Sequence, residues 1–227
     1  MANFHPSENE LLEYSAGNLD WALSIVVSAH MQMCPQCKQK CIQLNALGAS
    51  IMNNTKPVAV ETSSFDNVMA KIKQQTALGS TPEKPEQNIN ANKGASRTQH
   101  LPDVVSKLLP DNEKLHWKFV SPALREAQLV TGQDKYEVSF HKIKRGGKVA
   151  EHDHGGLEVT LVLEGSFSDA NGNYVAGDYI VKQPGEVHRP IAAQDQDCLC
   201  FTVVEAPVKV TGIIGKIVNP FLSISPR

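Results

Sequence analysis

The sequence lacks any long apolar run and any strong charge of one sign. No apolar stretch reaches the roughly 20 residues that a membrane-spanning helix needs. The formal net charge at pH 7 is only -2, which gives no electrostatic reason to expect direct binding of nucleic acid or of an anionic membrane. The hydrophobic share of 41% and the charged share of 20% are ordinary for a globular protein in water, and we expect that class.

The N-terminus also lacks the pattern of a secretory signal. The segment MANFHPSENELLEY is acidic, whereas a signal peptide begins with basic residues and continues with an apolar stretch. We therefore expect a cytoplasmic protein. The five cysteines agree with this expectation, because clustered thiols in a reducing compartment bind metal or act in redox chemistry more often than they form structural disulfides.

The first part of the chain predicts four helices, which cover about residues 7–17, 21–31, 35–47 and 65–76. Ser7 and Glu10 form a capping box for the first helix. Asp20 is the expected N-cap of the second, and Gly48 lies just past the expected end of the third. The fourth is indicated by apolar residues at helical spacing.

The rest of the chain changes character twice. The segment ALGSTPEKPEQNINANKGASRTQH has almost no large apolar residues and cannot offset its ordering entropy, so it predicts a linker. After about residue 115, short β-branched runs alternate with turn residues such as Asn171-Gly172, which predicts a small sandwich or barrel. We expect a helical domain at 1–76, a linker at 77–109 and a β domain at 110–227.

One histidine and three thiols lie close together in the stretch HMQMCPQCKQKC. On a helix, His30 and Cys34 stack four residues apart and Cys37 follows three residues later, so three ligands converge. Zinc prefers four nitrogen and thiolate ligands, and His5 is the only other histidine of the helical region. Cys41 competes for this place but lies a further turn along. We predict a zinc site whose four ligands are His5, His30, Cys34 and Cys37.

Two other interpretations of this stretch stay open. Cys34 and Cys37 could form a thioredoxin-like redox pair, although that motif expects a preceding strand and the preceding segment predicts a helix. Such an oxidoreductase would lose activity on alkylation and would hold no zinc. Alternatively, the thiols and histidines are ordinary core or surface residues.

The spacing of these four residues resembles that of the zinc-binding anti-sigma domain, a four-helix fold. The resemblance covers about the first third of the chain. It implies that the helices bind an extracytoplasmic-function sigma factor and hold it inactive, and that the zinc is structural.

A second set of candidate ligands lies in the β region. His152 and His154 are two residues apart, so they point to the same face of a strand. Glu158 can aim into the interior of a barrel, and His188 follows a later turn. Three imidazoles and one carboxylate suit a divalent first-row metal, with zinc, iron, manganese and nickel all chemically plausible.

This region closely resembles the cupin signature. The matching residues are Gly146, His152, His154, Glu158, Gly165, Gly177, Gly185 and His188. Gln183 replaces the usual proline and Ala192 the usual asparagine, but the metal ligands are intact. The resemblance implies a cupin β-barrel of the jelly-roll type over about the last half of the chain, and zinc is the expected ion.

Two further thiols, Cys198 and Cys200, share a strand face in the same region. They are either buried small apolar residues or thiols that respond to oxidants beside the cupin metal. Residues two apart on an extended strand are poorly placed for a mutual disulfide. The remaining histidines are interpreted as isolated core or surface residues, namely His100, His116 and His141.

The order of a zinc anti-sigma domain, a linker and a single cupin resembles the ChrR family of anti-sigma factors. The resemblance implies a two-domain α + β protein that is not an enzyme. Its first domain would inhibit the sigma factor, and its cupin would make release respond to oxidative stress such as singlet oxygen. The rival interpretation is a metal-dependent cupin enzyme, such as a dioxygenase, with an accessory zinc domain.

Overall fold

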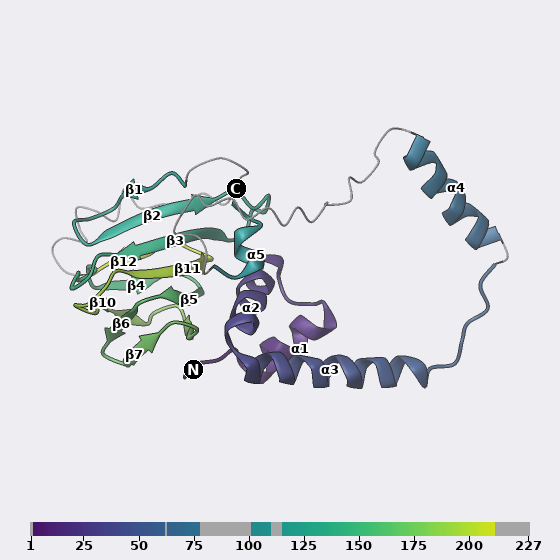
Figure 1. Ribbon diagram of the computed structural model, residues 1–227, viewed down its shortest axis with the longest axis horizontal. Helices are drawn as coiled ribbons and strands as arrows, with labels where there is room; N and C mark the ends of the chain where they lie inside the picture. Colours follow the sequence, from purple (N-terminus) through teal and green to yellow (C-terminus); the bar gives the residue numbers. More distant parts are fainter. Residues whose placement is uncertain (1, 62, 78–100, 110–114, 212–227) are drawn as a thin grey trace, which may run out of the picture. The chain divides into compact units, whose positions relative to one another are not determined.

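The computed structural model describes residues 2–61, 63–77, 101–109 and 115–211 (Figure 1). The chain divides into two compact units, one formed by residues 1–48 together with 98–227 and the other by residues 49–97. The first unit contains both predicted metal sites. It combines helices with antiparallel sheets, which confirms the expected mixture of α and β structure.

The first helix, α1, covers Glu8–Ala16 and begins at the predicted capping box. Ser7 Oγ accepts the backbone N–H of Glu10 at 3.2 Å, and the Glu10 carboxylate accepts the backbone N–H of Ser7 at 2.8 Å. Gly17 ends the helix with φ 74°, a left-handed conformation that glycine adopts without a steric penalty. Local sequence therefore sets both ends of α1.

The next two helices are longer than the sequence predicts. Helix α2 covers Trp21–Met33, and α3 covers Pro35–Asn53, so α3 passes its expected end at Leu47. The expectation that Gly48 follows the end of α3 is wrong, because this glycine lies inside the helix. A single glycine costs a helix only about 1 kcal/mol relative to alanine, which is too little to end it.

Asp20 is the N-cap residue of α2, as the sequence predicts, but its side chain makes no cap hydrogen bond. Its carboxylate accepts hydrogen bonds from Lys135 Nζ at 2.9 Å and from the Tyr136 hydroxyl at 3.0 Å. Both partners precede the strand β3, Glu137–Ile143. A tertiary contact has replaced the local cap.

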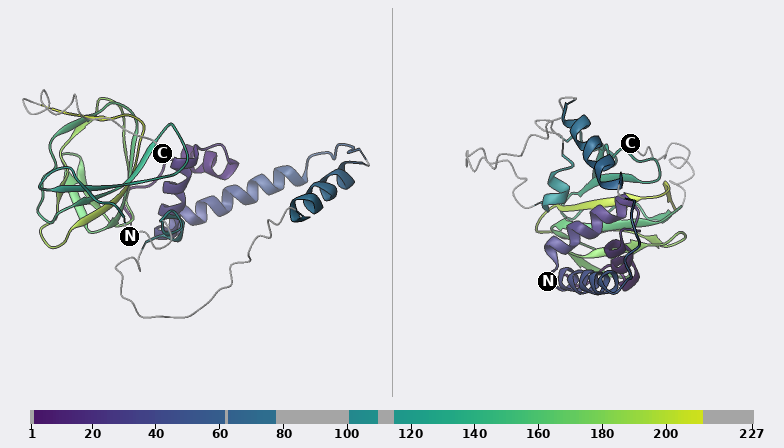
Figure 2. Two further views of the ribbon diagram at one scale, coloured as in Figure 1. Left: turned by 90° about the horizontal axis from the view of Figure 1, so that it is seen from above. Right: turned by 90° about the vertical axis from the view of Figure 1, so that its right-hand side faces the viewer.

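Twelve described strands form three antiparallel sheets, and Figure 2 shows them curving around a shared interior. The six-stranded sheet has the order β1 (Lys118–Phe119), β2 (Leu124–Leu129), β3, β11 (Cys198–Val204), β5 (Glu158–Glu164) and β8 (Tyr179–Lys182). A second sheet has the order β10 (Ile191–Ala192), β6 (Ser166–Asp169) and β7 (Gly172–Val175). The third has the order β12 (Val208–Val210), β4 (His152–His154) and β9 (Val187–His188).

The main core lies between α2 and the six-stranded sheet. Helix α2 contacts β5 and β11, and its Val26 and Val27 are fully buried in one cluster with Leu161 and Phe201. Full burial of such side chains contributes about 1.5–3 kcal/mol each. The N-terminal helices of this unit therefore share one core with the sheets.

A short helix, α5 (Asp103–Ser106), lies inside the segment expected to be linker. Its Val105 is fully buried in the core cluster, and the backbone N–H of Asp103 donates to Gln32 of α2. This packing is the reason that the last part of the expected linker is structured. Residues 78–100 of that segment lie outside the described residues.

The second unit contains the helix α4, Ser63–Ala77, which confirms the predicted fourth helix. Several of its apolar side chains are exposed, among them Phe65 and Val68. Among the helices that the structure describes, none is long and apolar enough to cross a membrane.

Candidate metal centres

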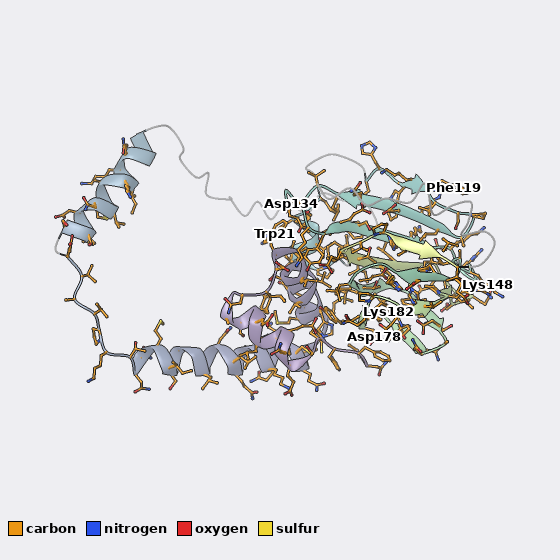
Figure 3. The ribbon with its side chains drawn as sticks, turned by 180° about the vertical axis from the view of Figure 1, so that it is seen from behind. Trp21, Phe119, Asp134, Lys148, Asp178 and Lys182 are labelled. Carbon is orange, nitrogen blue, oxygen red and sulfur yellow. The ribbon has the colours of Figure 1, made fainter. Side chains whose placement is uncertain are left out.

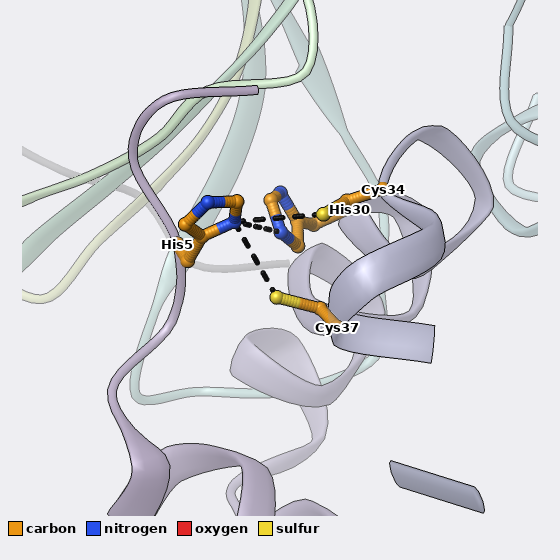
Figure 4. A group of neighbouring side chains, drawn as sticks. All are labelled: His5, His30, Cys34 and Cys37. Atoms are coloured by element: carbon orange, nitrogen blue, oxygen red, sulfur yellow. Dashed lines mark hydrogen bonds between the residues drawn. The ribbon is translucent and has the colours of Figure 1, made fainter. Parts of the chain in front are cut away.

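The structure brings His5, His30, Cys34 and Cys37 together, as the sequence predicts (Figure 4). His5 Nδ1 lies 3.5 Å from each of three atoms, which are His30 Nε2, Cys34 Sγ and Cys37 Sγ. All four possible ligand atoms lie within 4.8 Å of one another. We call this group the helical centre.

These spacings suit a tetrahedral zinc ion. With Zn–N near 2.0–2.1 Å and Zn–S near 2.3 Å, neighbouring nitrogen and sulfur ligands lie about 3.5 Å apart. The structure has this separation between His5 Nδ1 and both thiol sulfurs. The donor set of two imidazoles and two thiols is also one that structural zinc sites use.

The four side chains come from three different segments. His5 precedes α1, His30 is in α2, and Cys37 is in the first turn of α3. Cys34 is the extended C-cap of α2, so His30 and Cys34 do not share an uninterrupted helix as predicted. The backbone N–H of Cys34 still donates to the His30 carbonyl at 2.8 Å, which keeps the two side chains close.

The thiols of the helical centre are buried, where a deprotonated thiol needs a nearby positive charge. Burial is the main cause that raises the pKa of the Cys37 thiol to about 12, and the adjacent Cys34 thiol raises it further. Cys34 and Cys37 are both buried. A metal ion would supply the positive charge that stabilises the deprotonated thiol, so the residues fit the expected ion.

Cys41 is buried on α3 but does not belong to the cluster of four. Burial raises the pKa of its thiol, and a neutral buried thiol behaves as a small apolar side chain. Its exclusion agrees with the prediction that the further turn of α3 points it away from the others.

A second cluster joins His152, His154 and His188 from the neighbouring strands β4 and β9. His152 and His188 are paired across these strands, and their Nε2 atoms lie 3.0 Å apart. All three side chains are buried. We call this group the cupin centre.

Each of these imidazoles is fixed through its Nδ1 atom. His152 donates to the Ala150 carbonyl at 2.8 Å, and His154 donates to the Glu186 carbonyl at 2.7 Å. His188 Nδ1 lies 3.1 Å from Asp169 Oδ2. An Nδ1–H that donates leaves an unprotonated Nε2 lone pair, so three lone pairs meet in a buried space. That arrangement is suited to a cation.

Two of the three imidazoles of the cupin centre have lowered pKa values, and the third has a raised one. Burial lowers the pKa of His188 to about 4 and also lowers the pKa of His152, so both imidazoles are neutral at pH 7. Burial opposes charge on His154 as well, but the nearby Glu158 carboxylate outweighs it and raises the pKa of that imidazole. His154 Nε2 makes no well-formed hydrogen bond within the described residues, although Glu158 Oε2 lies 3.2 Å away. A neutral imidazole is the form that binds metal, and His152 and His188 are held in that form.

Glu158 lies next to the three histidines but is not in the cluster whose ligand atoms are mutually close. Burial raises the pKa of its carboxyl, but His154 and the other nearby histidines outweigh burial and lower it to about 2. Thr160 Oγ1 donates to Glu158 Oε1 at 3.0 Å. The carboxylate is therefore ionised and held beside the three histidines.

Sequence reasoning missed Asp169, which orients His188. Asp169 Oδ2 also pairs with Lys182 Nζ at 3.3 Å, and its Oδ1 accepts from the Tyr174 hydroxyl at 3.0 Å. The sequence signal is the turn that follows, because Asp169 Oδ1 accepts the Asn171 backbone N–H at 2.8 Å as aspartate does at the start of a turn.

A cavity of about 270 Å³ lies beside the cupin centre. Most of its lining is apolar, including Ile143, Val149, Phe167, Ile180, Val208 and Val210. Such a cavity can admit a small, largely apolar molecule to the histidines.

Cys200 lines the same cavity, and its Sγ lies 3.7 Å from Cys198 Sγ. This proximity was not expected for residues two apart on a strand, and an irregularity of β11 next to Cys200 accompanies it. Both thiols are buried. The hydrogen bond with Cys198 and, to a smaller extent, burial raise the pKa of Cys200, so this residue is not a reactive thiolate at rest.

The remaining histidines differ in their surroundings. His116 is exposed, as expected of an isolated residue. His141 lines the cavity, with Nε2 3.2 Å from Ser139 Oγ and 3.8 Å from Glu126 Oε1, so it has more partners than expected. His100 lies outside the described residues.

The comparisons with known proteins first define the class. Residues 105–207 match the family described as the ChrR cupin-like domain, so this part of the chain has a cupin-like fold. The histidine cluster lies in that fold, and the helical centre lies before it in the sequence. The protein is a cupin-class protein with a second candidate metal centre on helices.

The chain belongs to the ChrR family of anti-sigma factors. It is 33% identical over 220 residues to the anti-sigma-E factor ChrR of Cereibacter sphaeroides, covering 97% of this chain and 98% of that protein. It also matches a chain in the crystal structure of Rhodobacter sphaeroides SigE in complex with the anti-sigma ChrR. That match has a TM-score of 0.69 at 29% identity and covers 90% of this chain and 99% of the other. Membership in a family of regulators confirms the expectation that the chain is not an enzyme.

Proposed function

We propose that this chain is a cytoplasmic anti-sigma factor that binds and inhibits an extracytoplasmic-function sigma factor. The observation that carries the proposal is the similarity to an anti-sigma-E factor over 97% of the chain. The similar solved structure contains a sigma factor, SigE, with its anti-sigma factor. We expect the same class of partner here.

We assign the binding role to the helical domain, residues 1–76, as a zinc-bound four-helix fold. The division proposed here continues with a linker at 77–109, whose last part carries the packed helix α5, and a cupin β-barrel at 110–227. The helices α1 to α4 all lie within the proposed first domain. Exposed apolar side chains on α4, including Phe65 and Val68, give it surface that a partner can cover.

Both centres are proposed to hold a divalent metal. Zn²⁺ is proposed in the helical centre, formed by His5, His30, Cys34 and Cys37, because the ligand types and their spacing suit it. Zn²⁺ is also the proposed ion for the cupin centre, where Glu158 would join the three histidines. Bound there, a cation supplies the positive charge that the buried Nε2 atoms and the carboxylate lack.

The proposed role of the cupin part is to govern release of the sigma factor in response to oxidative stress such as singlet oxygen. A stimulus shifts the equilibrium between bound and free states only if it changes their relative free energies. The cavity gives a small oxidant access to the histidines and to Cys200. Cys198 and Cys200 remain candidate oxidant-responsive thiols within this proposal.

The first experiment tests inhibition. The chain is co-expressed with a candidate extracytoplasmic-function sigma factor from the same organism, purified, and added to a transcription assay that depends on that sigma factor. We expect a stable complex and loss of transcription. Lack of binding to every such sigma factor of the organism would contradict the proposal.

The second experiment separates inhibition from response. Variants His152→Ala, His154→Ala, Glu158→Ala and His188→Ala should still inhibit, but light with a photosensitiser should no longer release the sigma factor. His116→Ala is the matched control, since this histidine is exposed and outside both centres. A normal response in all four variants would remove the cupin centre from the mechanism.

A further inference from the structure

The N-terminal segment that carries His5 is attached to the cupin-like part through Asp178. This aspartate is fully buried at the turn between β7 and β8 (Figure 3). Its Oδ1 accepts the backbone N–H groups of Asn3 and of Phe4, the latter at 3.1 Å. Its Oδ2 accepts the backbone N–H of Val175 at 2.7 Å. One carboxylate thus joins the segment to the sheet.

The same turn holds the other imidazole of the helical centre. His30 Nδ1 donates to the carbonyl of Gly177 at 2.8 Å, which directs its Nε2 toward His5. The backbone N–H of Tyr179 donates to the Phe4 carbonyl at 3.0 Å, and the Tyr179 hydroxyl donates to Glu10 at 2.8 Å. Residues 177–179 therefore position both histidines of the helical centre.

The attached segment also contacts the hairpin that carries Asp169. The rings of Phe4 and Tyr174 lie with centroids 4.9 Å apart. The Tyr174 hydroxyl donates to Asp169, which in turn holds His188 of the cupin centre. Phe4 is the residue before His5. A chain of contacts therefore runs from His188 of the cupin centre to the segment that carries His5 of the helical centre.

We propose that the helical centre is a composite site, in which Asp178 of the cupin-like part is a positioning residue for the ligand His5. The inference rests on the proposal that the helical centre binds metal. A short N-terminal segment is poorly ordered unless it is tied down, and the Asp178 bonds supply that restraint. Without them, His5 must be ordered at the moment that metal binds, and the metal affinity falls.

The test uses Co²⁺ as the probe with the full chain. A bond between cobalt and thiolate gives a near-ultraviolet charge-transfer absorption, so this signal reports the helical centre, whereas the histidines and carboxylate of the cupin centre give none. Cobalt is titrated against a chelator for the original chain, Asp178→Asn, and the control Asp195→Asn, whose aspartate is exposed. The loss of an orienting partner typically lowers metal affinity by about 10–100-fold, and we expect this for Asp178→Asn alone.

A second variant covers the case in which Asp178→Asn does not fold. Phe4→Ala removes the ring contact with Tyr174 but keeps the backbone bonds, and we expect a smaller, several-fold loss of cobalt affinity. Phe119→Ala is its control, because that ring is exposed outside this region. Original cobalt affinity in a folded Asp178→Asn protein would overturn the composite site. If Asp178→Asn does not fold, original affinity in Phe4→Ala would overturn it. Absence of the thiolate signal in the original chain would instead contradict the proposed metal binding.

Discussion

At the scale of single residues, Cys41 shows that a buried thiol need not be a metal ligand. It lies on the same helix as Cys37 and is equally hidden from solvent, but only Cys37 has its sulfur among the other ligand atoms. The difference follows from spacing. Cys41 lies four residues after Cys37, so its side chain is about one helical turn further along the axis of α3. A buried thiol can thus be close to a metal site in sequence without contributing to it.

We predict that Cys41→Ala keeps the cobalt–thiolate absorption of the full chain and that Cys37→Ala loses most of it. Truncating Cys41 removes a buried sulfur, so we expect a loss of stability of about 1 kcal/mol in urea unfolding. Loss of the signal in Cys41→Ala at full folded content would show that the assignment of ligands is wrong.

Asp20 gives a prediction about pH. Hydrogen bonds from Lys135 and then from Tyr136 lower the pKa of its carboxyl below the ordinary value. A lowered pKa in the folded state means that the stabilisation is present above the unfolded pKa near 3.9 and is lost as the pH falls through the folded value. Because both ionic side chains are about half exposed, the gain is at most about 1 kcal/mol.

Urea unfolding of Asp20→Asn therefore should show a small loss of stability at pH 7. The difference from the original chain should shrink as the pH falls below about 4. The exposed Asp195→Asn serves as the control and should show no such trend. A difference that grows toward acid pH would contradict the assigned ion pair.

At the scale of elements, two glycines illustrate what ends a segment. Gly165 joins β5 to β6 with φ 72°, and a Cβ atom there would meet the Asp197 carbonyl oxygen at 2.4 Å. Gly48 lies within α3, where a Cβ atom would meet nothing within 4 Å. The first glycine is required by its backbone, and the second is only a weak point of a helix.

We predict opposite effects of the same substitution at these positions. Gly165→Ala should destabilise the chain by about 1–3 kcal/mol because of strain and steric overlap. Gly48→Ala should increase helix stability by about 0.5–1 kcal/mol. Circular dichroism during thermal unfolding measures both, and a stable Gly165→Ala protein would show that the corner is less constrained than its geometry indicates.

Elements were predictable where the cause was local. The capping box at Ser7 marks the start of α1, and apolar spacing marks α4. The end of α3 was missed because glycine is only a weak helix breaker. The partners of the Asp20 side chain were missed because they are more than a hundred residues away in sequence, and no local pattern indicates them.

At the scale of the whole molecule, the two centres predict two metal ions for each full chain. Plasma emission spectrometry of purified protein should find a metal-to-chain ratio of about two if both centres use their proposed ligands. Cys37→Ala and His152→Ala should each lower this ratio by about one, because each removes a ligand from one centre only. An unchanged ratio in either variant would exclude that centre, and His116→Ala should leave it at two.

The sequence by itself determined the helix starts, the local spacing of His30, Cys34 and Cys37, and the shared strand face of His152 and His154. These follow from helix and strand periodicity, which neighbouring residues encode. The tertiary structure decided how His30 is oriented by Gly177 and how Asp178 holds the segment before His5. Such contacts join residues more than 140 positions apart, and they depend on how α2 packs on the sheet, which no local pattern records.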